Sequence, residues 1–356
     1  MKFLQKILEG MKKKFEEVPL LRPLKPVIDA TDAFFFSPAA VTETVPHIRD
    51  GLDVKRYMSL VIVAALPAVV MSVYFFGLRV IAMILVSYIA GGLAETIFCI
   101  VRKEEITEGF LVTGLLFPLT LPPGCPLWVV AVGCVFGVIF GKEVFGGTGT
   151  NIFNPALVGR CFLAIAYPKI MAGGWIEPGS GLTGRAFQYA ADAVTTATPL
   201  VAKDWNWGAC GRVWLGNCLG CAGETCALAI LLGGVFLCLV RVANWRVPAG
   251  CLATVAIFSG IMSRAMPTTF APPLFQLGAG GLMFGVFFMA TDPVTSPITN
   301  PGKWVYAVLM GIVAVLIRSL TGYPEGIMFS ILLMNMAAPL MDEIVYAHRR
   351  RGYARA

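Results

Sequence analysis

Long stretches without a charged residue restrict what this chain can fold into more than any other feature. Tyr57–Phe76 and Gly109–Gly141 contain no charged side chain, and Val80–Val101 contains only Glu95. A helix crosses the hydrocarbon core of a bilayer with about 20 mostly apolar residues. Only 14% of the 356 residues are charged, against about 25% in soluble domains. The chain is therefore predicted to be an integral membrane protein, and a soluble enzyme is excluded.

About ten membrane spans are predicted, some of them broken by Gly and Pro. Pro122-Pro123-Gly124 divides the uncharged run at 109–141 into two spans, and two groups of five spans result, separated by residues 169–225. Five helices followed by five reverse the orientation of the second group, which predicts two inverted repeats. The predicted spans are 57–76, 80–101, two within 109–141, 154–167, 227–240, 247–263, 274–291, 304–317 and 326–341.

The basic residues predict the orientation of these spans. Ten helices put both ends of the chain on one side, and both ends are basic, at Lys12–Lys14 and at Arg349–Arg351. Cytoplasmic loops carry an excess of Lys and Arg. We therefore expect a cytoplasmic segment 1–56 that includes a basic amphipathic helix, membrane repeats 57–168 and 226–341, an external loop 169–225, and a cytoplasmic tail 342–356.

Two segments contain the polar motifs that invite a functional interpretation. Asp192-Ala-Val-Thr195-Thr196-Ala197-Thr198 lies in the predicted external loop, where by itself it is only a polar turn. Gly146-Gly-Thr-Gly149 precedes Thr150, Asn151 and Asn154-Pro155. No strand precedes these glycines and no lysine follows in the P-loop position, so we expect a tight turn between helices rather than a nucleotide triphosphate site.

Together these motifs resemble one family of membrane redox proteins. Residues 145–160, Ala290–Pro297 and Tyr323–Gly326 are similar to the family that contains the B subunit of the sodium-translocating NADH:quinone reductase and the D subunit of the Rnf ferredoxin:NAD reductase. The leader at Pro46–Asp50 and the pair Lys142-Glu143 favour the quinone reductase branch. Thr196 is a departure, since glycine is usual at this position of the family.

The resemblance implies two flavins. In the family, FMN is joined through a phosphoester to the last threonine of the Asp-x-x-Thr-x-Ala-Thr pattern, here Thr198, with Asp192, Thr195 and Ala197 completing the motif. A non-covalent riboflavin lies near the glycine-rich turn on the cytoplasmic side. Thr150, Asn151 and Asn154 are therefore expected to bind it, because uncharged amides suit a flavin without a phosphate.

The resemblance also implies a quinone and an ion path. Gly91, Gly92 and Glu95 match positions associated with quinone-site inhibitors; helix packing alone would equally explain the two glycines. An ionisable side chain within a span needs a partner or a wet cavity, so Glu95 is a candidate on physical grounds as well. Glu108, Asp292 and Asp342 are candidates for handling sodium or protons, although helix capping would also explain acids at these helix ends.

The cysteines and histidines limit the metal chemistry. The chain has only His47 and His348, which excludes a histidine-rich metal site or a haem with two axial histidines. Four cysteines cluster in or beside the external loop, and three interpretations remain open for them: unpaired thiols, disulfides, or an iron–sulfur or zinc site. No metal is expected. The four are Cys210, Cys218, Cys221 and Cys226.

The function implied is that of a flavin-carrying subunit that passes electrons to quinone, coupled to sodium export across a bacterial inner membrane. No Gly-x-Gly-x-x-Gly follows a predicted strand, so the chain is expected to be inactive without NADH-oxidising and second flavinylated partner subunits, and no nucleic-acid partner is expected. Two alternatives remain. One is the Rnf subunit, which would couple to ferredoxin and NAD. The other is a non-redox transporter or channel of the same fold.

Overall fold

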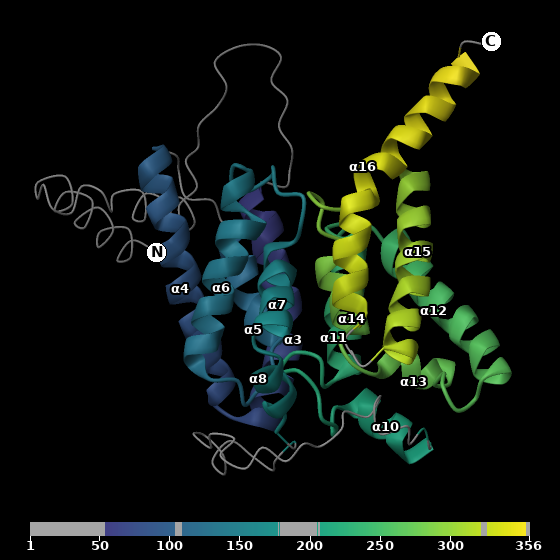
Figure 1. Ribbon diagram of the computed structural model, residues 1–356, viewed down its shortest axis with the longest axis horizontal. Coiled ribbons are helices and arrows are strands. Elements are labelled where there is room, and N and C mark those ends of the chain that lie inside the picture. The colour runs from purple at the N-terminus through teal and green to yellow at the C-terminus, as the bar shows by residue number, and fades with distance from the viewer. Residues whose placement is uncertain are drawn as a thin grey trace, which may run out of the picture.

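The computed structural model describes residues 54–103, 109–176, 178, 205, 207–321 and 326–353, and within these ranges it is all-helical (Figure 1). The first half of the chain forms one side of the molecule and the second half the other. The first half contains α3 (Val54–Phe76), α4 (Arg79–Arg102), α5 (Gly109–Leu119), α6 (Leu127–Gly141), η2 (Glu143–Phe145), α7 (Pro155–Ala166) and α8 (Pro168–Gly173).

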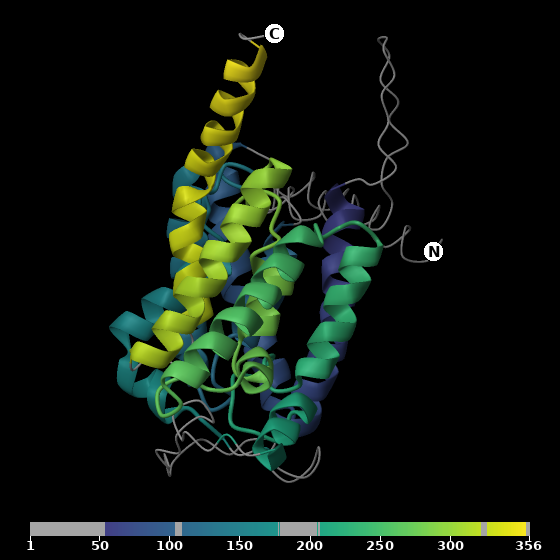
Figure 2. The same cartoon turned by 90° about the vertical axis from the view of Figure 1, so that its right-hand side faces the viewer.

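In the second half of the chain, one predicted span is divided into short pieces. The elements of this half are α10 (Trp207–Leu215), α11 (Ala227–Leu239), α12 (Arg246–Ala265), α13 (Pro273–Gly278), α14 (Leu282–Phe284), the π-helical turn η3 (Gly285–Met289), α15 (Asn300–Leu320) and α16 (Gly326–Tyr353). The predicted span at 274–291 is thus three short pieces. Figure 2 shows that α16 runs past the end of the bundle.

The predicted membrane character is confirmed. Six helices among the described residues are long and apolar enough to cross a bilayer, and α5, α7 and α11 are shorter apolar helices. On α4, Leu85, Ile89, Leu93 and Ile97 are each at least 56% exposed and recur every four residues. They form one apolar face of the helix, as expected for contact with lipid. The protein is a multi-pass membrane protein.

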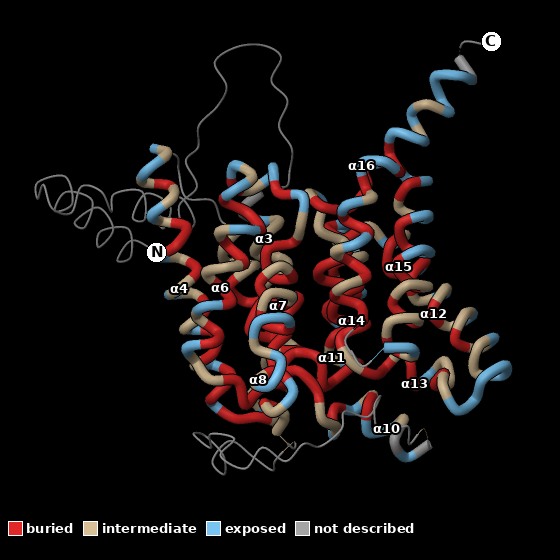
Figure 3. The backbone as a smooth tube through the Cα atoms, viewed as in Figure 1, coloured by how far each residue is buried: buried red, intermediate tan, exposed pale blue. Residues whose placement is uncertain are grey.

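Several helix pairs are equivalent in the two halves. Helix α4 packs against α5 and α6, and α6 packs against α7. In the second half α12 packs against α13 and α15, and α15 against α16. Between the halves, the first helices α3 and α11 meet, and so do the last helices α7 and α16. This is the pairing that two inverted repeats of five helices predict, and the buried residues concentrate along it (Figure 3).

Irregular backbone after α5 is held inside the protein. With 11 residues, α5 is only about 16 Å long, against about 30 Å of hydrocarbon. Residues 120–125 continue it without a regular helix and are buried. Arg79 donates hydrogen bonds to the carbonyl oxygens of Pro123 and Cys125, both at 2.9 Å. These bonds satisfy buried carbonyl groups of a segment that lies outside a regular helix.

The same segment is bonded to the other half of the chain. The N–H of Gly223 donates to the Leu119 carbonyl at 2.7 Å, and that of Ala222 donates to the Leu121 carbonyl at 2.9 Å. A Cβ added to Gly223 would lie 2.6 Å from the Leu119 Cβ, so only glycine permits this approach. Non-helical backbone at membrane depth is tolerated only when protein covers it.

Candidate functional site

A cavity opens between the two halves at the end of the bundle where α4 and α6 finish. It contains about 740 Å³ of space free of protein atoms, part of it open to the surroundings. Much of its wall is apolar, from α3, α5, α11 and η3. Its polar lining comes from both halves of the chain: Tyr57, Thr113, Lys142, Thr148, Asn151, Asn154, Thr291 and Asp292.

The segment 142–154, here called the glycine loop, closes one side of this cavity. Gly146, Gly147 and Gly149 have φ angles of +110°, +96° and +98°, a region that side chains other than glycine rarely adopt. The resulting turn brings Thr148 against the start of α5, where a Cβ added to Gly109 would lie 3.0 Å from the Thr148 hydroxyl oxygen. The predicted tight turn is confirmed.

The two predicted asparagines line the cavity and also hold the loop. Asn154 Oδ1 accepts the Ala156 N–H at 3.1 Å and so caps α7, which leaves its NH₂ group for a ligand. Asn151 Oδ1 accepts the Gly149 N–H at 3.3 Å, and its Nδ2 donates to the Phe153 carbonyl at 2.9 Å. The amide oxygen and the NH₂ group of Asn151 can each form a further hydrogen bond.

Thr150 lies in the same loop but outside the cavity lining. It is exposed, and its hydroxyl donates to the Gly147 carbonyl at 3.0 Å. Thr148, two residues earlier, is the threonine that reaches the cavity. The glycine conformations decide which of the two threonines turns inward, and sequence alone gives no sign of that choice.

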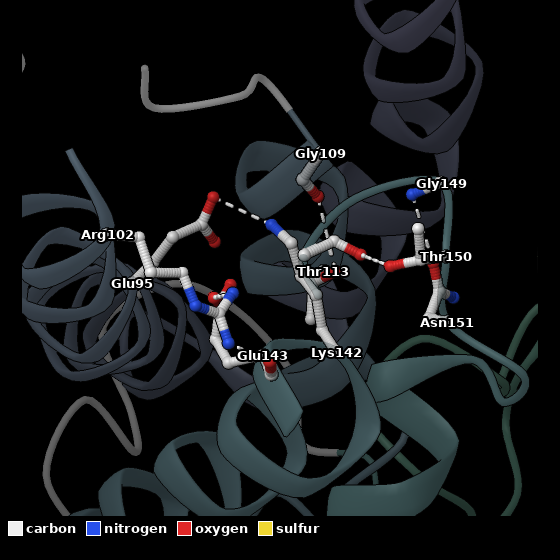
Figure 4. Close-up of polar contacts among 10 residues, drawn as sticks. Glu95, Arg102, Gly109, Thr113, Lys142, Glu143, Gly149, Thr150 and Asn151 are labelled. Carbon is white, nitrogen blue, oxygen red and sulfur yellow. Dashed lines mark hydrogen bonds and ion pairs between the residues drawn. The ribbon is translucent and has the colours of Figure 1, made fainter. Parts of the chain in front are cut away.

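Glu95 has the partner that its place in a span requires. Its Oε1 lies 2.7 Å from Lys142 Nζ, and the two side chains are only 2% and 4% exposed. Lys142 is also part of the cavity lining, whereas Glu95 is not. Figure 4 shows the lysine reaching from the end of α6 toward the carboxylate on α4.

A second ion pair lies beside the first. Arg102 Nη1 is 3.1 Å from Glu143 Oε2, and Arg102 also donates to the Glu143 carbonyl oxygen. The Arg102 side chain is 28% exposed, so this pair is nearer the surface than the first. Neither residue lines the cavity. The adjacent residues Lys142 and Glu143 thus tie the end of α4 to the end of α6.

The predicted glycine pair divides into two environments. A Cβ on Gly91 would lie 2.8 Å from Cys134 Sγ, so Gly91 permits the close packing of α4 on α6. A Cβ on Gly92 would meet the Phe110 ring at 3.6 Å, an ordinary contact. Helix packing accounts for Gly91. Gly92 is not required for packing, and its association with a quinone stays a prediction.

The predicted ion candidates differ in what they contact. Asp292 lines the cavity, and its carboxylate accepts the Val294 N–H at 3.1 Å and the Thr295 hydroxyl at 3.3 Å. Asp342, on α16, accepts the N–H groups of Ile298 and Thr299 at 2.7 and 3.0 Å. Asp342 therefore holds the segment that leads into α15. Glu108 lies outside the described residues.

Of the remaining predictions, some fall outside the described residues, and that for the cysteines can be compared with the structure. Asp192, Thr195, Ala197 and Thr198 lie outside the described residues, as does the N-terminal segment up to residue 53. No disulfide joins any of the ten cysteines, all of which are described. Of the three interpretations of the cysteine cluster, thiols outside disulfides agree with the structure. The cluster residues are Cys210, Cys218, Cys221 and Cys226.

The sequence did not point to several residues at the site. Tyr57, Thr113 and Thr148 line the cavity because distant segments converge there, and no local pattern marks them. Lys142 could have been singled out from the sequence as a candidate partner of Glu95. Glu95 needed a partner on physical grounds, and Lys142 is a cation at the end of a neighbouring span.

Comparison with known proteins agrees with this architecture. The model of the NQR2, RnfD, RnfE family matches residues 41–350. The B subunit of the Na(+)-translocating NADH-quinone reductase from Pseudomonas paraeruginosa is 36% identical over 99% of both chains. The proteins of the same name from Azotobacter vinelandii and Pseudoalteromonas atlantica are each 37% identical, over 98% and 96% of both chains. The chain belongs to the NQR2, RnfD, RnfE family.

Proposed function

We propose that this chain is the flavin-carrying membrane subunit of a sodium-pumping NADH:quinone reductase, coupling electron transfer to quinone with sodium export. The observation that carries the proposal is the similarity over nearly the full length to relatives named as the B subunit of that enzyme. The cavity between the halves supports it, because a bound cofactor there would contact both halves of the membrane domain. An Rnf-type subunit is the second candidate within the family.

The cavity suits an uncharged flavin. Its apolar walls can pack against the ring system, and the amides of Asn151 and Asn154 with the Thr148 hydroxyl can bond to the polar edge. Lys142 and Asp292 are the charged groups of the lining. When bound, a flavin supplies one- or two-electron transfer. The residues of this chain would hold the ring, orient its polar edge and limit the access of water.

Three further assignments are part of the proposal. Thr198 carries FMN through a phosphoester, within the motif that includes Asp192, Thr195 and Ala197. A quinone head group binds near Gly92 and Glu95, with Gly91 setting the helix spacing. Sodium passes along a route that includes acids at the helix ends. The candidates for that route are Glu108, Asp292 and Asp342.

The proposed orientation places the cavity at the cytoplasmic face of a bacterial inner membrane. Arg102, Lys103, Lys142 and Lys303 all belong to the ends of elements on the cavity side, as the positive-inside rule requires. The loop with Thr198 is then external. The chain needs partner subunits that oxidise NADH and pass electrons to it, including an iron–sulfur flavoprotein and a second flavinylated subunit.

The covalent flavin provides the test. Thr198→Ala should abolish the fluorescence that stays with the denatured band in a gel, while the protein still reaches the membrane. Thr195→Ala and Thr196→Ala are the matched controls, and both should keep some label. A labelled Thr198→Ala band would refute the attachment site. No covalent flavin in the unmodified protein would favour a non-redox transporter, and reduction by ferredoxin rather than transfer to quinone would favour the Rnf subunit.

A further inference from the structure

Lys142 touches two parts of the proposed electron path at once. Its ammonium group belongs to the lining of the cavity and lies 2.7 Å from the Glu95 carboxylate. With 4% exposure, its charge has little contact with water, and charges interact more strongly where water is excluded. Any redox group in the cavity would therefore experience this cation, together with the partial compensation that Glu95 provides.

We propose that Lys142 sets the reduction potential of the flavin in the cavity and that Glu95 moderates this effect. The proposal rests on the proposed function, which places a flavin there. Reduction adds negative charge to the flavin ring system, so a nearby cation favours the reduced form over the oxidised form. The Glu95 carboxylate opposes the cation. Lys142 is thus a tuning residue, which acts through its charge and takes no part in the transfer itself.

The adjacent ion pair supplies a comparison within the same structure. Arg102 and Glu143 form a pair of the same type at 3.1 Å, and Glu143 directly follows Lys142 in the sequence, but neither residue of the pair lines the cavity. If any charge near this end of α4 changed the potential, Arg102 would do so as well. If only a cation in the cavity wall can change the reduction potential of the flavin, substitutions of Lys142 and of its partner Glu95 will shift the potential and substitution of Arg102 will not.

The experiment measures the potential of the non-covalent flavin in the purified complex. Lys142→Met should retain the flavin but lower the ratio of reduced to oxidised form at least tenfold, a downward shift of about 59 mV for a one-electron step. Lys142→Arg keeps the charge and should stay near the parent potential. Glu95→Gln removes the compensating negative charge and should shift the potential upward. Arg102→Met should change it little.

Opposite signs separate an electrostatic role from a structural one. The assignment is overturned if Lys142→Met keeps its flavin at the parent potential, or if Lys142→Met and Glu95→Gln shift it in the same direction. If Lys142→Met does not assemble, the double variant Glu95→Gln with Lys142→Met decides, because it removes both charges of the buried pair together. Its potential must lie below that of Glu95→Gln; equal values refute the proposal.

A separate variant tests the site on which this inference rests. Thr148→Trp places a large side chain in the cavity from the glycine loop and should remove the non-covalent flavin, measured by extraction from the denatured complex. A full flavin content in Thr148→Trp would mean that the flavin lies elsewhere, and the assignment of the cavity would fall together with that of Lys142. If only the proposal for Lys142 is wrong, Thr148→Trp should still remove the non-covalent flavin.

Discussion

The two segments that close the cavity come from opposite halves and are held in different ways. The glycine loop relies on three residues with positive φ and on the amides of Asn151 and Asn154. The segment 290–299, here called the proline loop, contains Pro293 and Pro297 and has no described residue at positive φ. Carboxylates hold it instead, Asp292 from within and Asp342 from α16.

This difference indicates which side of the cavity can adapt. A glycine-rich segment loses more conformational freedom on folding than one fixed by proline. Its amides also bond weakly compared with carboxylates, because hydrogen bonds to ionised groups are roughly twice as strong as neutral ones. The proline loop is therefore the firm wall, and the glycine loop is the wall that a ligand can help to order.

Asp342→Ala should produce the largest loss of stability. It removes the acceptor of the Thr299 N–H, in a residue only 6% exposed, and that of the Ile298 N–H. Leaving the buried N–H and hydroxyl of Thr299 without this acceptor should cost about 3 kcal/mol, seen as a lower midpoint of thermal unfolding in detergent. Glu343→Gln is the matched control, since its pair with Arg350 is exposed and should matter little. Equal effects would contradict a firm proline loop.

Gly147→Ala should cost less, about 2 kcal/mol, because a side chain is strained at its φ of +96°. No atom lies within 4 Å of the added Cβ, so a steric clash plays no part. Gly211→Ala, in the middle of α10 and equally open, should instead stabilise the protein by up to about 1 kcal/mol. Thermal midpoints that move in the same direction would show that the loop does not depend on positive φ.

Asn154→Ala should have the smallest effect on stability, about 1 kcal/mol, from the loss of the α7 cap. Asn154→Asp keeps an acceptor at the cap and should retain stability, but it places a negative charge in the cavity lining. The content of non-covalent flavin should therefore fall in both variants. If Asn154→Asp lost stability and kept its flavin, Asn154 would be a structural residue only.

The helices could be predicted from the sequence because uncharged runs and their Gly-Pro interruptions are local. The predicted break at Pro122–Gly124 lies between α5 and α6, and the span at 274–291 is divided where Gly278, Gly280 and Gly281 interrupt it. The length of α5 was harder to predict, because buried irregular backbone at residues 120–125 continues it. Such backbone depends on partners such as Arg79, which only the folded structure brings close.

The site was predicted in part. Asn151, Asn154 and Asp292, which were singled out from their motifs, all line the cavity, although nothing in the motifs placed them together. Their roles in flavin and ion binding stay predictions. Glu95 was singled out because a lone acid in a span is costly. Its pairing with Lys142, 47 positions later, depends on how α4 crosses α6. Contacts between helices decide which residues pair. A single sequence shows that a charged residue in a span needs a partner, but not which residue that partner is.

The hydrogen bonds from Ala222 and Gly223 to the backbone after α5 have a consequence for biogenesis. The ribosome makes those two donors roughly a hundred residues after the carbonyl groups of Leu119 and Leu121 that they bond. During synthesis the first five helices thus contain backbone acceptors that hydrocarbon cannot satisfy. The early part of the chain must be sheltered, by water or by the insertion machinery, until the segment before α11 emerges and completes the bonding.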